Sequence, residues 1–191
     1  MTSEMDFTEF GSEEDLRGFD YPAPGTYHLA VTGVDETPKN VDGLKFTLEV
    51  LNGTVEGQAS KSFAETFFFP SPESKDGGKF AKKRLAKFAL AVGIINPTAL
   101  GSRVQIDWQE ASGRQLVAKV ENYMRKGNDG REYKGAQISG LDMWRIDAPE
   151  VEAVPKDQEA LAMAAPAAVG ANGPAGEAPA KAAKPDPYAD L

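Results

Sequence analysis

Leu44-Lys45-Phe46-Thr47-Leu48-Glu49-Val50 alternates apolar and polar side chains without interruption. Successive side chains of a strand point to opposite faces, so this period of two predicts a strand with one face in a core. Asn52-Gly53 follows almost at once and predicts a tight turn, because both residues tolerate positive φ. The stretch therefore predicts a β-strand that leads into a hairpin.

Similar strands are predicted on both sides of this stretch. Upstream, Tyr27, Leu29 and Val31 alternate with small or polar residues across 26–34. Downstream, residues 60–69 end in Phe67-Phe68-Phe69, so both faces of that strand are apolar near its end. We expect one face to join the core, while the phenylalanine run supplies either further core or rings on which bases stack.

Residues 79–92 predict an amphipathic helix, which follows a loop at 70–78 rich in proline and glycine. At about 100° per residue the apolar residues share one side, and Gly93 ends the helix. The opposite side is basic and consists of Lys79, Lys82, Lys83, Arg84 and Lys87. Most such faces are merely solvated. Three of these residues are nevertheless candidate phosphate contacts, namely Lys79, Lys83 and Lys87.

Two hairpins are predicted after the helix. The first joins residues 101–108, where apolar residues alternate up to Trp108, to residues 115–123 through a turn at Ser112-Gly113. The second joins 115–123 to 133–138 through 126–130, a segment dense in residues that tolerate positive φ. Trp144 and Ile146 are expected to close the folded body.

The order of three strands, one helix and three shorter strands contains no βαβ alternation, so a parallel sheet is not expected. A helix between the third and fourth of about five curved antiparallel strands is the order found in OB folds. The sequence thus predicts a mainly β protein, specifically an OB-fold-like antiparallel β-barrel with one amphipathic helix and disordered tails. A generic small barrel or sandwich is the alternative.

The composition excludes several kinds of site. The 191 residues include no cysteine and a single histidine, His28, which excludes disulfides, cysteine zinc clusters and thiol nucleophiles. No serine or aspartate motif accompanies His28, so a packed imidazole is a better interpretation than a general base. We expect no enzymatic activity, no cofactor and no metal. An acidic N-terminus and the lack of an apolar run of about 18 residues predict a soluble cytoplasmic protein without a membrane partner.

Acidic residues concentrate in the tails. The net charge is −8, but residues 1–20 hold seven acids and one base, and residues 151–191 hold six acids and three bases. The middle of the chain is therefore close to neutral, which permits a polyanionic partner. Alanine, glycine and proline dominate 160–184, a composition that cannot form a core. Four segments are predicted: an acidic arm at 1–20, a nucleic-acid-binding domain at 21–150, a disordered linker at 151–184 and an acidic tip at 185–191.

The second hairpin carries the residue types that bind single-stranded nucleic acid. Bases stack on aromatic rings without regard to sequence, while lysine and arginine follow the phosphates. Two tyrosines and four cations surround its glycines: Tyr123, Arg125, Lys126, Arg131, Tyr133 and Lys134. The alternative is an exposed hairpin that its charges keep soluble, with the tyrosines packed across the strands.

The tip Pro185-Asp186-Pro187-Tyr188-Ala189-Asp190-Leu191 combines acids with an aromatic ring and a leucine behind the linker. This pattern suggests a tethered peptide held by another protein, although a frayed terminus with incidental charge is the alternative. The candidate partner-binding residues are Asp186, Tyr188, Asp190 and Leu191.

Together these features resemble the single-stranded DNA-binding proteins of bacteriophages and bacteria, which pair an OB fold with a linker and an acidic, hydrophobic-ended tip. Gly127-Asn128-Asp129-Gly130-Arg131-Glu132-Tyr133 is similar to the loop between the last two strands of that group. Residues 25–57 and the helix end at 91–93 are also similar to a phage domain family encoded among replication and recombination genes. The tip departs from the bacterial one, which has more consecutive acids and ends in proline and phenylalanine. The resemblance implies that the tip competes weakly with DNA.

The predicted function is sequence-tolerant binding of single-stranded DNA during phage replication or recombination, with the tip recruiting partner enzymes. The sequence leaves open whether the chain forms a homo-oligomer. The alternative is a protein-interaction adaptor whose small β-barrel binds no nucleic acid.

Overall fold

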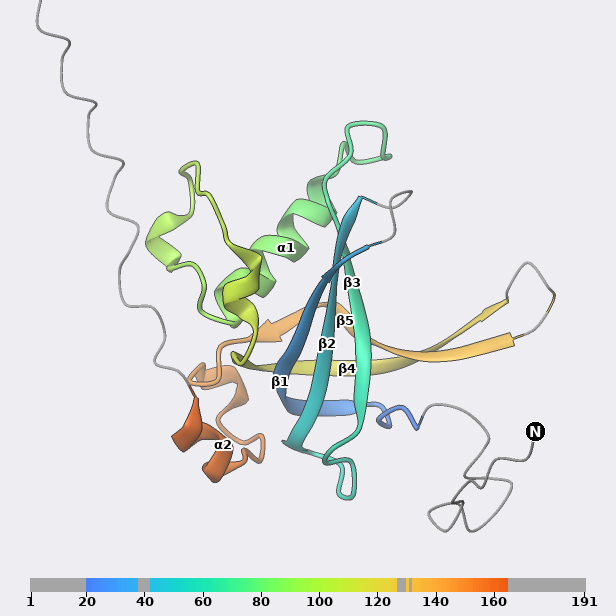
Figure 1. Cartoon of the computed structure of the whole chain (residues 1–191), viewed down its shortest axis with the longest axis vertical. Coiled ribbons are helices and arrows are strands. Elements are labelled where there is room, and N and C mark those ends of the chain that lie inside the picture. Colours follow the sequence, from blue (N-terminus) through green and yellow to red (C-terminus); the bar gives the residue numbers. More distant parts are fainter. Residues whose placement is uncertain (1–19, 38–41, 127–129, 131, 165–191) are drawn as a thin grey trace, which may run out of the picture.

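Five antiparallel strands form one sheet in the order β3-β2-β1-β4-β5 (Figure 1). The computed structural model describes residues 20–37, 42–126, 130 and 132–164, without the side chain of Tyr133. The strands are β1 (Gly25–Glu36), β2 (Gly43–Gly53), β3 (Ser62–Phe68), β4 (Gln115–Lys126) and β5 (Glu132–Trp144). The prediction of a mainly β protein is confirmed.

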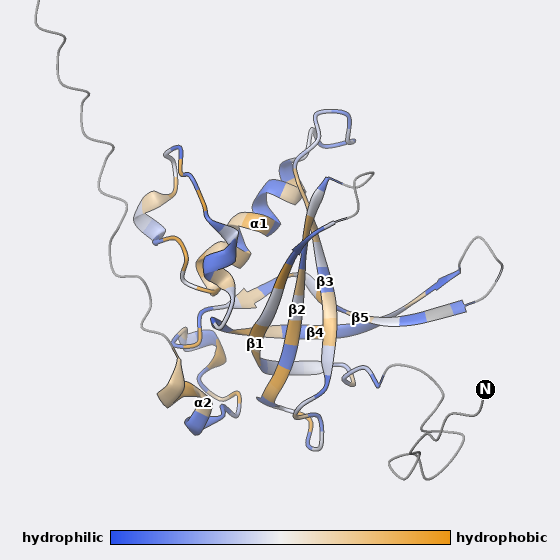
Figure 2. Cartoon of the chain, in the orientation of Figure 1, coloured by the Kyte–Doolittle hydropathy of each residue, from blue (hydrophilic) through white to orange (hydrophobic). Residues whose placement is uncertain are grey.

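The core lies where the alternating patterns predicted it. Leu29 on β1 and both Phe46 and Leu48 on β2 are fully buried. Their alternation with hydrophilic residues is visible along the strands (Figure 2). The rings of Phe46, Phe67 and Phe88 form an aromatic cluster, with centroids 5.5 Å apart for Phe46–Phe67, 4.5 Å for Phe46–Phe88 and 4.7 Å for Phe67–Phe88. This cluster joins β2, β3 and the helix that follows β3.

The helix α1 (Lys79–Ala91) begins and ends as the sequence predicts. The carboxylate of Asp76 accepts hydrogen bonds from the backbone N–H of Phe80, at 2.6 Å, and of Gly78, at 3.0 Å. These bonds lower the pKa of Asp76, the Phe80 N–H contributing most. Gly93 follows the helix with a φ of 72°, a conformation that a glycine adopts without strain.

The expected closed barrel does not form through main-chain pairing. Among the described residues β3 pairs only with β2, and β5 pairs only with β4, so the sheet is open between β3 and β5. The two edges still approach each other, and the backbone N–H of Ile138 on β5 donates to the carboxylate of Glu65 on β3. Side chains therefore bridge the gap that a strand ladder would otherwise fill.

The predicted strand at 101–108 is wrong. The chain is irregular there, between the 3₁₀ helices η1 (Pro97–Ala99) and η2 (Trp108–Ala111). The segment leads into η2, which lies against β1, and both sides of β1 are already paired, with β2 and β4. Trp108 instead packs edge-to-face on Phe46, with centroids 6.1 Å apart. The described residues thus form five strands where six were expected.

The turn predicted at Asn52-Gly53 is also wrong. β2 continues through both residues, which pair with His28 and Tyr27 on β1. A Cβ on Gly53 would lie 2.3 Å from the Tyr27 ring, so glycine allows this ring to approach the strand. Close packing accounts for this glycine, and the turn comes after it.

The C-terminal part of the described chain packs on the outside of β1 and β4. It contains η3 (Pro149–Val151) and the short helix α2 (Gln158–Met163), and Val151 is buried. Residues 151–164, which the composition assigned to the linker, are therefore part of the folded body. The acidic arm up to residue 19, the rest of the linker and the tip lie outside the described residues.

No helix within the described ranges is both long and apolar enough to cross a membrane.

Candidate nucleic-acid interface

The end of the β4–β5 hairpin projects from the body (Figure 1). Side chains alternate between the two faces of a strand, so Tyr123 and Arg125 lie on one face of β4 while Met124 and Lys126 lie on the other. All four are exposed. The hairpin thus presents a face with an aromatic ring and a guanidinium, and a second face with a thioether and an ammonium group.

The ring of Tyr123 lies against the backbone of Gly135, its partner on β5. A Cβ on Gly135 would come within 2.6 Å of both Cζ and the hydroxyl oxygen of Tyr123, so only glycine leaves room for the ring. The residue remains 41% exposed. Cross-strand packing therefore supports this tyrosine without covering it.

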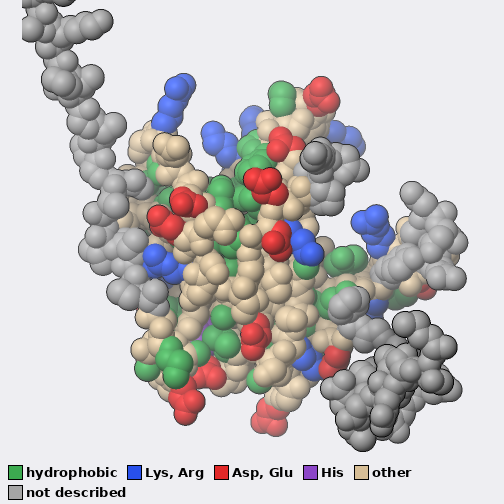
Figure 3. Space-filling model, in the orientation of Figure 1, with side chains coloured by type: hydrophobic (Ala, Val, Ile, Leu, Met, Phe, Trp, Pro, Cys, Tyr) green, Lys and Arg blue, Asp and Glu red, His purple; other side chains and the backbone are tan. Residues whose placement is uncertain are grey.

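Three of the predicted cations are exposed on this hairpin: Arg125, Lys126 and Lys134. Within the described residues none of them forms an ion pair. Cationic side chains stand on the projecting ribbon in Figure 3. Arg131 and the side chain of Tyr133 lie outside the described residues, although the backbone of Tyr133 pairs with Arg125.

Phe68 provides a second exposed ring. Phe67 is buried and Phe68 is 56% exposed, so the two residues face opposite sides of β3. The sequence left open whether this run supplied core or surface, and the structure assigns one ring to each. Phe68 lies on β3, whereas Tyr123 lies on the projecting ribbon, so the two rings mark two different surfaces.

The basic side of α1 lies on the body, away from the hairpin tip (Figure 1). Lys79 and Lys83 are exposed, and Lys87 is half-buried. The structure therefore does not bring these three lysines together with the hairpin residues into one cluster.

Arg84 does not belong to the solvated face to which its spacing assigned it. Its Nη2 donates to Oε1 of Glu65 at 3.1 Å and to the carbonyl of Ile138 at 3.0 Å, and its Nε donates to the carbonyl of Gly140 at 3.1 Å. The guanidinium also lies over the Phe67 ring, 4.7 Å from its centroid. Arg84 is thus a bridge between α1, β3 and β5.

Glu65 is the buried partner of this bridge, with 4% exposure. Burial raises the pKa of Glu65, while the charge of Arg84 and the Ile138 N–H act in the opposite direction. Both carboxylate oxygens accept hydrogen bonds, from Arg84 and from Ile138, so the geometry suits the ionised form. The sequence did carry a signal for this pair, because Glu65 occupies an inward position between Phe63 and Phe67.

The bridge lies where β5 bends. Val120 pairs with Ile138 but Ala118 pairs with Met143, so β5 carries extra residues between these two points. Gly140 sits in this bulge with a φ of 50°. Bulges bend a strand and increase its twist. Arg84 binds the carbonyl of Ile138, where the bulge begins, and that of Gly140 inside it, so it holds the bend in place.

His28 is a structural residue. Its Nε2 lies 3.0 Å from the side-chain oxygen of Gln115, and its Nδ1 accepts the backbone N–H of Asp157 at 3.0 Å. Burial lowers the pKa of His28, partly opposed by Gln115 and by the charge of Asp157. The neutral ring thus uses both nitrogens to hold the segment before α2. No group of three or more His, Asp or Glu side chains that could hold a metal ion occurs in the described ranges.

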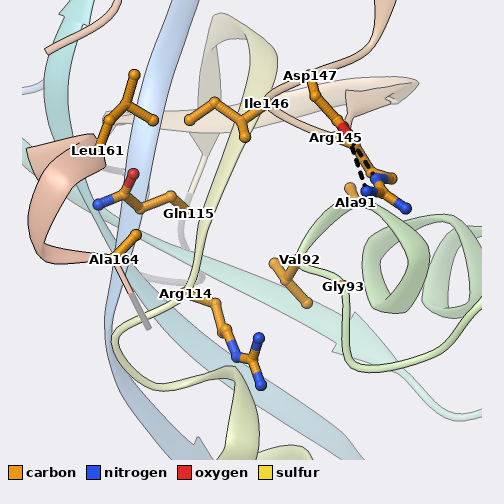
Figure 4. Close-up of a pocket in the computed structure, with 10 residues that line it drawn as sticks. All are labelled: Ala91, Val92, Gly93, Arg114, Gln115, Arg145, Ile146, Asp147, Leu161 and Ala164. Carbon is orange, nitrogen blue, oxygen red and sulfur yellow. Dashed lines mark hydrogen bonds and ion pairs between the residues drawn. The ribbon is translucent and has the colours of Figure 1, made fainter. Parts of the chain in front are cut away.

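A surface cavity lies at the other end of β4, where the sequence gave no indication of a site. It has a volume of about 320 Å³ and lies between the end of α1, the start of β4, residues 145–147 and α2. Figure 4 shows Val92, Ile146 and Leu161 around the opening, with Arg114 and Arg145 at its edges. These residues come from four separate segments, so no local pattern could reveal the cavity.

Comparison with known proteins identifies a family without assigning it an activity. None of the curated proteins matches the chain. The sequence profile of a family described as a protein of unknown function, DUF669, matches residues 9–155, which include the whole sheet and α1. The chain therefore belongs to the DUF669 family.

Proposed function

We propose that this protein binds single-stranded DNA without sequence preference, through the projecting β4–β5 hairpin, and that it does so during phage DNA replication or recombination. It acts as a binding protein rather than an enzyme. The observation that carries this proposal is the Tyr123 ring, supported from behind by Gly135 and open to solvent, with Arg125 on the same face.

The ring supplies sequence-tolerant affinity. Every base has a π-face, and stacking on an aromatic side chain contributes about 1–3 kcal/mol per base. A ring that already rests on the backbone loses little rotational freedom when a base stacks on it, because its packing on Gly135 holds it in place. The hairpin therefore offers a preorganised platform for one base.

The cations supply contacts to the phosphates. Arg125, Lys126 and Lys134 form no ion pair with other described residues, so a phosphate need not displace an acid from them. If these three and Arg131 each contact one phosphate, the logarithm of the binding constant falls with the logarithm of salt concentration with a slope of about −3.

Fluorescence anisotropy with a labelled oligo-dT across a salt series tests the proposal. We expect saturable binding that weakens with salt, and a further loss of at least tenfold for Arg125→Glu. Arg103→Glu is the matched control, because Arg103 is exposed in the irregular segment at 101–107, away from the hairpin. Absence of binding at low salt would refute the proposal and favour the adaptor function instead.

A second comparison locates the binding surface. Tyr123→Ala should weaken oligo-dT binding more than Phe68→Ala if the hairpin holds the strand. The reverse order would place the strand across the outer face of β2 and β3, where Phe68 is the exposed ring.

Recruitment completes the proposed function. The tip at 185–191 would bind replication or recombination enzymes through Asp186, Tyr188, Asp190 and Leu191, in the host cytoplasm. A pull-down of phage replication proteins with the full chain, and with these four residues replaced by alanine, tests this part separately from DNA binding.

A further inference from the structure

A second cavity lies next to the one at the start of β4. A smaller cavity of about 190 Å³ shares Ala91 and Arg145 with the first, and Met143 and Trp144 line it. Both cavities contact the C-terminal end of α1; together we name them the groove, and each is one of its two largely apolar compartments. Arg145 lines both cavities, and Figure 4 shows it at the edge of the larger one.

We propose that this groove binds the tip of the same chain, with Tyr188 and Leu191 in the two apolar compartments and the carboxylate of Asp190 on Arg145. This inference does not depend on nucleic-acid binding. It assigns an intramolecular resting site to a segment whose proposed role is to bind other proteins.

The chemistry of the groove matches the tip. Val92, Ile146 and Leu161 give the larger compartment apolar walls. Three cations, Arg114, Arg145 and Lys87, line the two cavities against two acids, Asp147 and Glu150, so cations are in the majority. A peptide that alternates acids with an aromatic ring and a leucine complements such a surface in both respects.

Arg145 keeps donors for a ligand. Its Nε and Nη2 bind the carboxylate of Asp147, at 3.0 Å and 2.9 Å, in an exposed ion pair. A guanidinium has five N–H donors, so Nη1 remains available to a second carboxylate. The ion pair with Asp147 also fixes the orientation of the guanidinium.

The spacing within the tip fits two compartments. Tyr188 and Leu191 are three residues apart, which corresponds to roughly 10 Å in an extended peptide. Asp190 lies between them, and Arg145 lines both compartments.

The point where the chain leaves the described body places the tip within reach. Ala164, the last described residue, itself lines the larger cavity. The alanine-, glycine- and proline-rich residues 165–184 predict a coil with an r.m.s. length of roughly 25 Å. A tether of this length gives the tip a millimolar effective concentration at the groove, so even a weak contact is populated.

This site lies far from the hairpin. Gln115 lines the cavity and begins β4, whereas Tyr123 is eight residues further along the same strand, a separation of roughly 26 Å. The groove would therefore compete with partner proteins for the tip. The tip would not compete with a strand held at the hairpin.

Photo-crosslinking of the full chain tests the inference. With p-benzoylphenylalanine at position 188, we expect crosslinks to residues 87–93, 143–147 and 161–164, at least tenfold above those formed with the same group at Ala178 in the linker. Mixing isotope-labelled and unlabelled protein distinguishes crosslinks within one molecule from crosslinks between molecules.

Charge variants provide the controls. R114E/R145E should lower the yield at least fivefold, whereas R103E should leave it unchanged. D186N/D190N should lower it as well, and this pair leaves the folded body untouched. The proposal would be overturned by crosslinks that map to residues 123–134 or that form mainly between molecules. It would also be overturned if neither R114E/R145E nor D186N/D190N changed the crosslinking yield.

Discussion

The two halves of β4 differ in what surrounds them. From Leu116 to Val120 the strand lies mainly in the core, with β1 on one side, and three consecutive side chains, Leu116, Val117 and Ala118, are fully buried. From Tyr123 to Lys126 it pairs only with β5, and every side chain is exposed. One continuous strand thus provides both the centre of the fold and the candidate binding surface.

The difference shows that a strand's function depends on how many neighbours it has. In the first half every side chain except that of Lys119 is buried, so substitutions at the buried positions should lower stability. In the second half the backbone pairing holds the ribbon while the side chains remain available to a ligand. Substitutions there should change binding and leave folding nearly intact.

Arg84→Met should have the largest effect, because it acts where the two halves meet. It leaves the buried carboxylate of Glu65 without its partner, a change that typically costs about 3–5 kcal/mol of unfolding free energy. Urea denaturation followed by circular dichroism measures this loss.

The double variant E65L/R84M should recover most of the stability, because it removes both charges together. If Arg84→Met were as stable as the wild type, the bridge would not be what holds β3 to β5.

Tyr123→Ala should weaken oligo-dT binding by roughly 5- to 150-fold, equivalent to about 1–3 kcal/mol for one lost stacking contact. The free energy of unfolding should change by less than about 1 kcal/mol, because the ring covers no core residue. Tyr123→Phe keeps the ring and should bind nearly as well as the wild type. A large loss of stability in Tyr123→Ala would mean that the two halves of β4 are not separate in function.

Gly135→Ala should have a smaller effect in the same place. The new methyl group would lie 2.6 Å from the Tyr123 ring, so the ring has to move off the backbone. We expect a loss of binding of a few fold with little change in stability, since an exposed side chain can relax. Anisotropy and urea denaturation of the same preparation measure both. Unchanged oligo-dT binding would show that bases do not stack on the Tyr123 ring in its position against Gly135.

The lowered pKa of His28, which lies beside the buried half of β4, predicts a modest pH dependence of the free energy of unfolding. Burial lowers its pKa below the ordinary value of 6.5, so between 6.5 and the native pKa the unfolded chain binds the proton while the folded chain does not. The free energy of unfolding should therefore fall as pH decreases through this window. Denaturation midpoints at pH 7.5 and 5.5 measure the effect, and His28→Gln should reduce it. If the free energy of unfolding of His28→Gln fell as much as that of the wild type, the effect would belong to other titratable groups.

The core strands and the helix could be predicted from the sequence because their patterns are local. The alternation around Phe46 and the helical spacing around Phe88 each describe one element packed on a single core. The alternation up to Trp108 has the same form but describes no strand, because its segment leads to β1, whose two sides are already paired. Pairing is a property of the whole sheet, and periodicity within one segment cannot report it.

The site was predictable only in part, for the same reason. The hairpin tyrosines and cations lie close in sequence, and the structure places Tyr123, Arg125, Lys126 and Lys134 on one exposed ribbon. The Glu65–Arg84 bridge and the groove beside α1 combine residues from distant segments. Residues 151–164 are held on the body by hydrogen bonds to His28 and Gln115. Composition does not reveal such contacts.

The exit of the chain at Ala164 and the projecting ribbon lie at opposite ends of β4. If several copies sat side by side along one nucleic-acid strand, each would point its ribbon inward and Ala164 outward. The grooves beside Ala164 would then repeat along the outer surface of the filament, at a spacing set by how closely the copies sit.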